Sequence, residues 1–248
     1  RPPQLWRYTS LLDRQRSLVD LYLSPSRFTL EMHRERGFAA PFRHLPYFLP
    51  TADAAPAEPA RADRPYFLFV GRLEKLKGVE VLLDRFGAHP RADLVIAGDG
   101  EHAPVLRRLA EGNDRVKFLG RVDPAALDRY YQQALALVVP SVCFETFGII
   151  LIESFRQGTP VIARAVGPFP EIVRRGGGGL LFEGPEDLLA ALRRVQGDPA
   201  LRERMSREAL ASFEANWTED AVVPRYLDVV RRAARAKGRE DVAAALGG

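Results

Sequence analysis

The chain has 248 residues, 46% of them apolar, which is enough to bury a core and excludes an intrinsically disordered protein. The formal net charge is +4, but nearly all of the positive charge is arginine, scattered among 32 acidic residues. Because no basic block is present, we do not expect nucleic acid as a partner.

The first part of the chain, residues 1–50, predicts little regular structure. Short extended pieces are predicted at 19–23 and 44–48, with a helix over Ser24–Arg36 between them. Two strands and one helix cannot form a core alone, so we expect a remnant of a larger domain. Residues 51–65 are rich in Ala, Pro and charged residues without a periodic apolar face, which predicts a linker.

From residue 66 onward, apolar runs alternate with segments of helical period. The runs that predict strands are 66–70, 93–97, 116–119, 134–139, 160–163 and 179–182. The predicted helices between them are 79–86, 103–110, 125–133, 147–157 and 187–195. Near-continuous apolar strands separated by helices predict a Rossmann-like α/β domain, a parallel sheet with helices on both faces.

The end of the chain predicts two further helices, over 200–213 and 218–235, and no strand after them. Residues after Lys237 are rich in Ala and Gly and are expected to fray. The chain begins at Arg1 without a basic or apolar leader, so we expect it to be a piece of a longer protein.

Cys143 is the only cysteine, which leaves no intrachain disulfide and no cysteine cluster for zinc, and favours an intracellular, cytoplasmic location. No apolar run approaches the roughly 18 residues that a membrane-spanning helix requires.

Ligands of a doubly wound sheet bind beyond the carboxyl ends of the strands, so the residues after each apolar run carry the information. Gly71 allows a tight turn after the first strand, and Arg72 and Lys77 lie on either side of the loop that leads into a helix. A planar guanidinium and a compact ammonium suit a diphosphate. A solvated basic turn would have the same composition, and this segment alone does not separate the two.

Two other loops are less specific. The glycines of Ala97–Gly100 allow close approach of a ligand but lack the third glycine of a dinucleotide fingerprint, so we interpret this turn as mainly structural. Phe118–Val122 could present backbone groups to a nucleobase, although a plain turn would look the same. Gly167–Glu171 is a weaker candidate for the lining of the cleft.

The most specific segment is Pro140–Glu153, after the strand at 134–139. Phe147 to Ile150 are predicted to open a helix, whose free N–H groups can hold phosphate or sugar oxygens. Glu145 is predicted in the loop and Glu153 two helical turns further on, about 12 Å along the helix axis. A glycosidase holds its carboxyl pair within roughly 9.5 Å, so this spacing favours two clamps on an extended ligand. The alternative for Glu153 is a solvent-facing position.

In combination, the GRLxxxKG segment, the FLGRV turn and the E-x7-E spacing within FETFGIILIE resemble the family 4 glycosyltransferases, which have the two-domain GT-B fold. The resemblance covers residues from about 66 to 235. It implies a donor-binding domain over 66–213 and a crossover helix with a tail over 214–248. Residues 18–50, with YLSPSRFT and LPYFLP, are similar to the end of the family's N-terminal domain.

The resemblance also implies roles for individual residues. Arg72 and Lys77 would bind the donor diphosphate, and Glu145 would bind the donor sugar as the third member of the catalytic set. Gly71 belongs to the donor site, where Glu153 would hold the ribose. The other implied donor-binding residues are Arg121 and Val122 at the base, and Phe147, Gly148, Ile149 and Ile150 through their backbone N–H groups.

The resemblance implies a hexosyltransferase-like activity. A sugar would pass from a nucleoside-diphosphate sugar to a glycan or lipid-linked acceptor, with its anomeric configuration retained. No metal ligands and no cofactor are expected. The full-length enzyme would need its N-terminal acceptor domain and has scope for peripheral membrane association. The chain alone is expected to bind donor better than it turns it over.

Two other functions stay open at this point. A nucleotide-sugar epimerase shares related architecture, although the E-x7-E and GRLxxxKG segments argue against it. A non-catalytic nucleotide-sugar-binding module is compatible with so short an N-terminal part.

Overall fold

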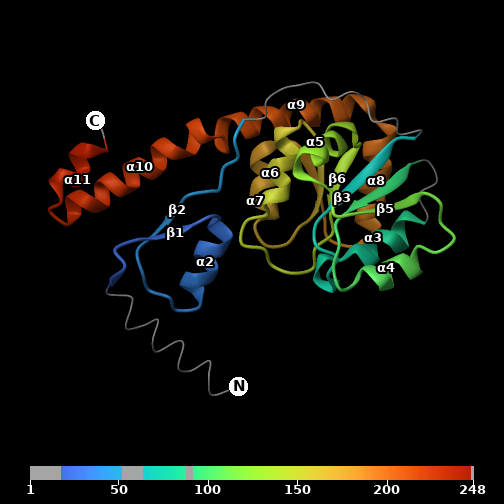
Figure 1. The fold of residues 1–248 in the computed structure, drawn as a ribbon, viewed down its shortest axis with the longest axis horizontal. Helices are drawn as coiled ribbons and strands as arrows, with labels where there is room; N and C mark the ends of the chain where they lie inside the picture. Colours follow the sequence, from blue (N-terminus) through green and yellow to red (C-terminus); the bar gives the residue numbers. More distant parts are fainter. Residues whose placement is uncertain (1–17, 52–63, 88–91, 247–248) are drawn as a thin grey trace, which may run out of the picture.

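The computed structural model describes residues 18–51, 64–87 and 92–246, so nearly all of the predicted linker lies outside the described part. A small two-stranded unit and a larger α/β unit are bridged by long helices at the C-terminal end (Figure 1). The large unit carries the predicted site segments.

The sheet of the large unit has six parallel strands in the order β5-β4-β3-β6-β7-β8. The strands are β3 (Tyr66–Val70), β4 (Asp93–Ala97), β5 (Val116–Gly120), β6 (Ala136–Val139), β7 (Val161–Arg164) and β8 (Gly179–Phe182). All six predicted strands are present, with ends that differ by no more than two residues. The first strand of this sheet, β3, lies in its middle. The chain then adds β4 and β5 on one side, and β6 follows on the other side of β3. This order confirms the predicted Rossmann-like fold.

Helices cover both faces of this sheet (Figure 1). They are α3 (Val79–Phe86), α4 (Ala103–Leu109), α5 (Pro124–Gln133), α6 (Ile149–Arg156), α7 (Phe169–Gly176), α8 (Pro185–Gly197) and α9 (Pro199–Asn216). The prediction that Phe147 opens a helix is wrong, because α6 begins two residues later at Ile149. Gly148 precedes it with φ of 95°, a left-handed conformation that ends the loop and starts the helix.

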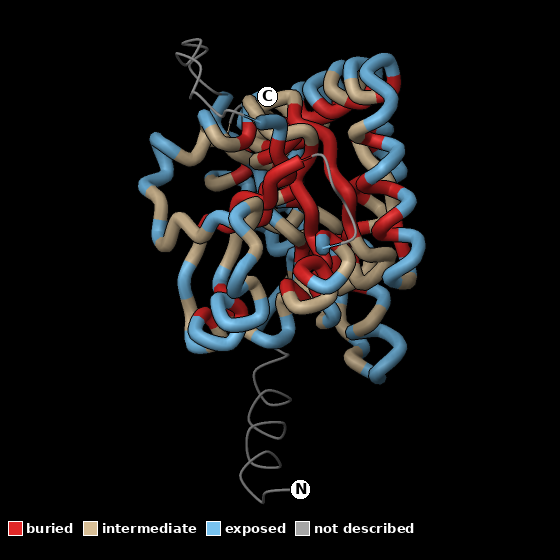
Figure 2. Tube along the Cα trace, turned by 90° about the vertical axis from the view of Figure 1, so that its right-hand side faces the viewer, coloured by how far each residue is buried: buried red, intermediate tan, exposed pale blue. Residues whose placement is uncertain are grey.

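The sheet residues are buried from both sides, as the red tube through the centre of Figure 2 shows. Phe67 and Phe69 point to the layer that contains α3 and α8, whereas Leu68 points to the layer that contains α6 and α7. This alternation follows from the strand period of two, and both faces are apolar because helices cover both.

The small unit consists of the parallel strands β1 (Tyr22–Ser24) and β2 (Phe42–His44), joined by α2 (Arg27–Glu35). Three predicted boundaries were wrong, the first being the start of β1, which is Tyr22 rather than residue 19. The helix begins after Ser26, whose side chain accepts a hydrogen bond from the Thr29 N–H and caps it. The second strand ends at His44 rather than beginning there, and Pro46, which lacks an N–H, follows closely.

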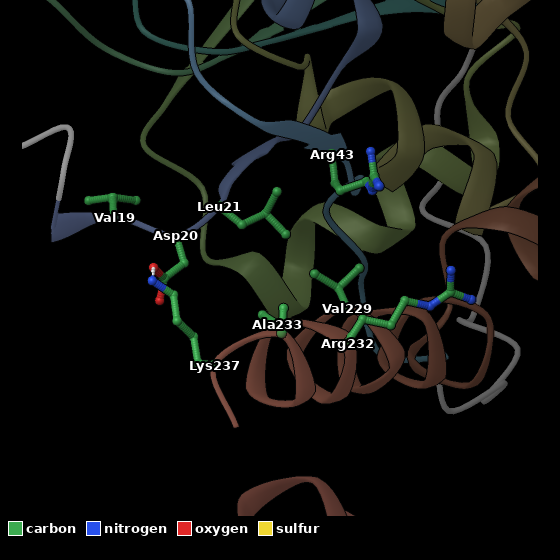
Figure 3. A pocket seen from close by; sticks show the side chains of 9 residues that line it. Val19, Asp20, Leu21, Arg43, Val229, Arg232, Ala233 and Lys237 are labelled. Atoms are coloured by element: carbon green, nitrogen blue, oxygen red, sulfur yellow. Dashed lines mark ion pairs between the residues drawn. The ribbon is translucent and has the colours of Figure 1, made fainter. Parts of the chain in front are cut away.

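The C-terminal helices connect the two units. From α9 the chain continues into α10 (Glu219–Ala236), which passes beside β1, and then into α11 (Glu240–Ala245). Residues 240–245 form a helix in which Ala243 is buried, so the predicted fraying after Lys237 was wrong there. Figure 3 shows the ion pair of 2.6 Å between Lys237 and Asp20, beside a pocket of about 500 Å³. Within the described residues, no helix has the length and apolarity needed to cross a membrane.

Candidate active site

The site lies where β3 and β6 are neighbours, because the connections from these two strands leave the sheet in opposite directions. The loop after β3 includes the short 3-10 helix η2 (Lys75–Lys77), and the loop after β6 runs to Gly148. The Val142 N–H donates to the Leu76 carbonyl oxygen at 2.9 Å and joins the two loops. A Cβ atom at Gly78 would lie 2.2 Å from the Pro140 carbonyl oxygen, so this approach requires glycine.

This loop contact brings Lys77 and Glu145 together as an ion pair. Their side chains are 21% and 26% exposed, so the pair is partly shielded from water. Arg72 is arranged differently: its side chain is 77% exposed and its Nη1 lies 2.8 Å from a carboxylate oxygen of Glu74. Sequence reasoning missed Glu74 as the partner of Arg72, since an acid in a basic loop has no distinctive pattern.

The N-terminus of α6 opens beside this pair. Phe147 lies in the loop, is 2% exposed, and packs edge to face with Tyr47 at 5.4 Å between ring centroids. In the described part of the chain, the N–H groups of Phe147, Gly148, Ile149 and Ile150 have no hydrogen-bond acceptor. Such free N–H groups at a helix start attract anions and hydroxyl oxygens.

Glu153 lies one turn into α6, half-buried, where Tyr131 of α5 donates a hydrogen bond to its Oε2 at 2.9 Å. Burial, followed by the charge of Glu153, raises the pKa of Tyr131 well above its ordinary value, so this hydroxyl stays a donor. Glu153 therefore does not simply face solvent, and its Oε1 accepts no hydrogen bond from the residues that the structure describes. The estimate of about 12 Å along a helix does not apply, because α6 begins only at Ile149.

A pocket of about 510 Å³ lies at the ends of β3, β4 and β5. It brings together four of the predicted donor-site residues, and its lining is Val70, Gly71, Arg72, Ala97, Gly98, Asp99, Gly100, Arg121, Val122 and Leu127. Neither glutamate of the E-x7-E segment lines it. A Cβ at Gly98 would lie 1.9 Å from the Gly71 carbonyl oxygen, which accords with the structural interpretation of the Ala97–Gly100 turn.

The weaker candidate segment Gly167–Glu171 lies between the Glu145 loop and the small unit. A Cβ on Gly167 would be 3.5 Å from the backbone N of Glu145, so this residue backs the loop. The Glu171 carboxylate accepts hydrogen bonds from the N–H groups of Arg27 and Phe28, at 3.1 and 3.4 Å. Burial raises the pKa of Glu171 even though these hydrogen bonds oppose the shift.

Across residues 18–51, 64–87 and 92–246, no cluster of three or more His, Cys, Asp or Glu side chains could hold a metal ion.

The comparison with known families decides the class of the protein. Residues 52–211 match the model of the family described as Glycosyl transferases group 1, which is more than half of the chain. The chain belongs to this family. The group 1 glycosyltransferase chain is 37% identical over 205 residues to a D-inositol 3-phosphate glycosyltransferase from a Nocardioides species. That alignment covers 73% of this chain and 44% of the relative.

Solved structures agree with this assignment. Sucrose-phosphate synthase from Thermosynechococcus elongatus superposes with a TM-score of 0.75 at 27% identity, over 90% of this chain and 61% of that chain. HepE from Anabaena, solved in complex with UDP, gives a TM-score of 0.79 at 18% identity, over 87% and 65% of the two chains. The GT-B fold expected for this group 1 glycosyltransferase chain is thereby confirmed. The chain spans less than half the length of the curated relatives it matches.

Proposed function

We propose that this chain supplies the donor site of a retaining, metal-independent glycosyltransferase that uses a nucleoside-diphosphate sugar. The observation that carries the proposal is the Lys77–Glu145 pair beside the free N–H groups of α6, at the point where β3 and β6 diverge. A cation, a carboxylate and a helix N-terminus together match the phosphate and hydroxyl groups of such a donor.

Each group has a distinct task in this reaction. Donor phosphate oxygens replace Glu145 as the partner of Lys77, which frees the Glu145 carboxylate to accept hydrogen bonds from sugar hydroxyls. Arg72 is 77% exposed, so its ion pair with Glu74 is screened by water, and in the proposed complex Arg72 exchanges Glu74 for the phosphates. Negative charge grows on the diphosphate as the glycosidic bond breaks, so these cations and the α6 N–H groups stabilise the transition state more than the ground state.

The nucleoside fits the remaining features. Glu153, oriented by Tyr131, offers one carboxylate oxygen to the ribose hydroxyls. The base enters the pocket beside Arg121 and Val122. A hydroxyl of the acceptor, a glycan or lipid-linked molecule, attacks the anomeric carbon from the face on which the diphosphate departs and passes its proton to the departing phosphate oxygen, so the anomeric configuration is retained. The acceptor is held by a second α/β half, and the proposal places the enzyme in the cytoplasm.

Calorimetric titration of the chain with UDP, GDP and ADP tests the donor site. We expect saturable binding of one nucleotide, weakened in both Arg72→Ala and Glu153→Ala. Arg108→Ala on α4, outside the pocket lining, is the matched control and should bind normally. Failure of all three nucleotides to bind would contradict the proposed donor site, as would variants that bind like the wild type.

Transfer is tested on the longest natural protein that contains this chain. Release of nucleoside diphosphate from the nucleotide sugar should depend on an acceptor and continue in excess EDTA. Loss of turnover in EDTA, restored by a divalent ion, would contradict metal independence. Product with inverted anomeric configuration would contradict the proposed retaining mechanism.

A further inference from the structure

The first turn of α2, in the small unit, contacts the loop of the large unit that carries Glu145. Thr29 Oγ1 donates to the Thr146 carbonyl oxygen at 2.9 Å, and the single hydrogen of Ser26 Oγ is shared between that oxygen, at 2.8 Å, and Thr29 Oγ1, at 2.9 Å. The two lone pairs of one carbonyl can accept both hydroxyls. The peptide that follows Glu145 is therefore anchored by side chains from more than a hundred positions earlier in the chain.

A second contact holds the residue on the other side of Glu145. The rings of Phe28 and Phe144 lie 5.1 Å apart between centroids, in a tilted arrangement. The turn that carries Phe28 is itself tied to α7, because Glu171 accepts hydrogen bonds from the N–H groups of Arg27 and Phe28. The small unit thus contacts residues 144 and 146, and the same turn of α2 is hydrogen-bonded to α7 of the large unit.

The loop needs such support because it has little structure of its own. No helix or strand is assigned between β6, which ends at Val139, and α6, which begins at Ile149. Phe144 and Thr146 are both exposed apart from these contacts, so the large unit alone constrains them weakly.

We propose that Ser26, Phe28 and Thr29 are positioning residues that hold the Glu145 carboxylate in register with the donor sugar. The inference rests on the proposed function, in which Glu145 binds sugar hydroxyls. The phosphates and the nucleoside are bound by Lys77, Arg72 and Glu153, on segments that α2 does not touch in the described contacts. Loosening α2 therefore affects the sugar more than the nucleotide, which meets the Thr146–Phe147 peptide only through the Phe147 N–H.

Thr29→Val is the most direct test, because it removes the hydroxyl with little change in volume. Thr29→Ser keeps the hydroxyl and should restore binding. Thr51→Val, which removes an exposed hydroxyl outside the contact, is the matched control. The probes are the nucleotide that the wild-type chain binds and its glucose derivative, as UDP with UDP-glucose, GDP with GDP-glucose or ADP with ADP-glucose.

We expect Thr29→Val to weaken binding of the nucleotide sugar about two- to tenfold, the effect of one hydrogen bond, with a smaller loss for the nucleotide. An equal loss for both ligands, accompanied by a lower melting temperature, would show a role in folding only and overturn the inference. Unchanged affinity for the sugar derivative would also overturn it. The wild-type titration tests the proposed function separately: if neither ligand binds, the proposed function fails first, and this inference fails with it.

Discussion

Lys77 and Glu145 are 68 positions apart in the chain and form an ion pair between the loops that follow β3 and β6. Both side chains are partly buried, so water screens their attraction less than it would on the open surface. The pair therefore positions a cation and a carboxylate where phosphate and sugar meet in the proposed donor complex.

Lys77→Met should weaken binding of the nucleoside diphosphate by roughly tenfold to a hundredfold, the effect expected when a charge-assisted hydrogen bond is lost. Calorimetric titration measures the change. Lys75→Met is the control, since Lys75 is exposed on the same 3-10 turn. Equal losses in the two variants would show that only the general positive charge of the loop matters.

Glu145→Gln should weaken binding of the nucleotide sugar rather than binding of the nucleoside diphosphate. The amide no longer neutralises Lys77, so affinity for the nucleoside diphosphate should stay the same or rise. Affinity for the nucleotide sugar should fall several-fold, because a neutral amide accepts weaker hydrogen bonds from hydroxyls than a carboxylate does. Competition between the two ligands measures the ratio directly, and a parallel change in both affinities would contradict the sugar-binding role.

Tyr131→Phe should release Glu153 and reduce discrimination between the nucleotide and its 2′,3′-dideoxy form. The chain should also lose about 1 kcal/mol of unfolding free energy, measured in urea, because one hydrogen bond is removed. Tyr130→Phe is the neighbouring control, since its hydroxyl makes no hydrogen bond with the residues that the structure describes, although it lies near Tyr66. Undiminished discrimination in Tyr131→Phe would show that the hydrogen bond does not orient Glu153.

Gly98→Ala should destabilise the chain by roughly 3 kcal/mol or more, because the new Cβ would overlap backbone rather than a movable side chain. Its distance to the Gly71 carbonyl oxygen would be 1.9 Å. Gly112→Ala is the control: φ is 78° and nothing lies within 4 Å, so only the left-handed conformation, about 1 kcal/mol, is penalised. Urea unfolding that gives equal losses would contradict the close β3–β4 loop contact.

His44 should make stability depend on pH. Burial, followed by the charges of Arg27, Arg225 and Arg175, lowers its pKa below the ordinary value of 6.5. The unfolded chain therefore binds a proton more readily than the folded one, so this contribution is complete above about pH 6.5 and is lost as pH falls through the depressed pKa. Urea unfolding between about pH 7.5 and 5 should show it.

Two variants isolate this effect. His44→Asn should reduce the dependence of the unfolding free energy on pH. Arg225→Gln should reduce it by a smaller amount, because it removes one nearby positive charge. If the unfolding free energies of the wild type and His44→Asn fall in parallel as pH is lowered, the pH dependence belongs to other groups.

Local patterns predicted most of the secondary structure because strand and helix periods are local properties. Phe67 and Leu68 belong to one apolar run, and burial of both faces of the sheet explains why the run does not alternate. The starts of α2 and α6 were misplaced, since Ser26 and Gly148 decide them through a cap and a left-handed backbone. Apolar periodicity carries neither signal.

The sequence predicted several residues of the candidate site but not the contacts between them. Arg72, Lys77 and Glu145 were identified from their places after predicted strands, whereas Glu74 and Tyr131 were not. Tyr131 lies in a helix with no recognisable motif, and its partnership with Glu153 depends on how α5 and α6 pack.

The sequence by itself determined the α/β class, the six strands, the motifs of the glycosyltransferase family and the residues that compose the loops. Only the tertiary structure decided which of these residues meet, as Lys77 does with Glu145 and Thr29 with the Thr146 carbonyl. The physical reason is that apolar period and turn chemistry act over a few residues. Strand order, in contrast, is set by burial of the whole sheet, which brings together segments that are distant in the chain.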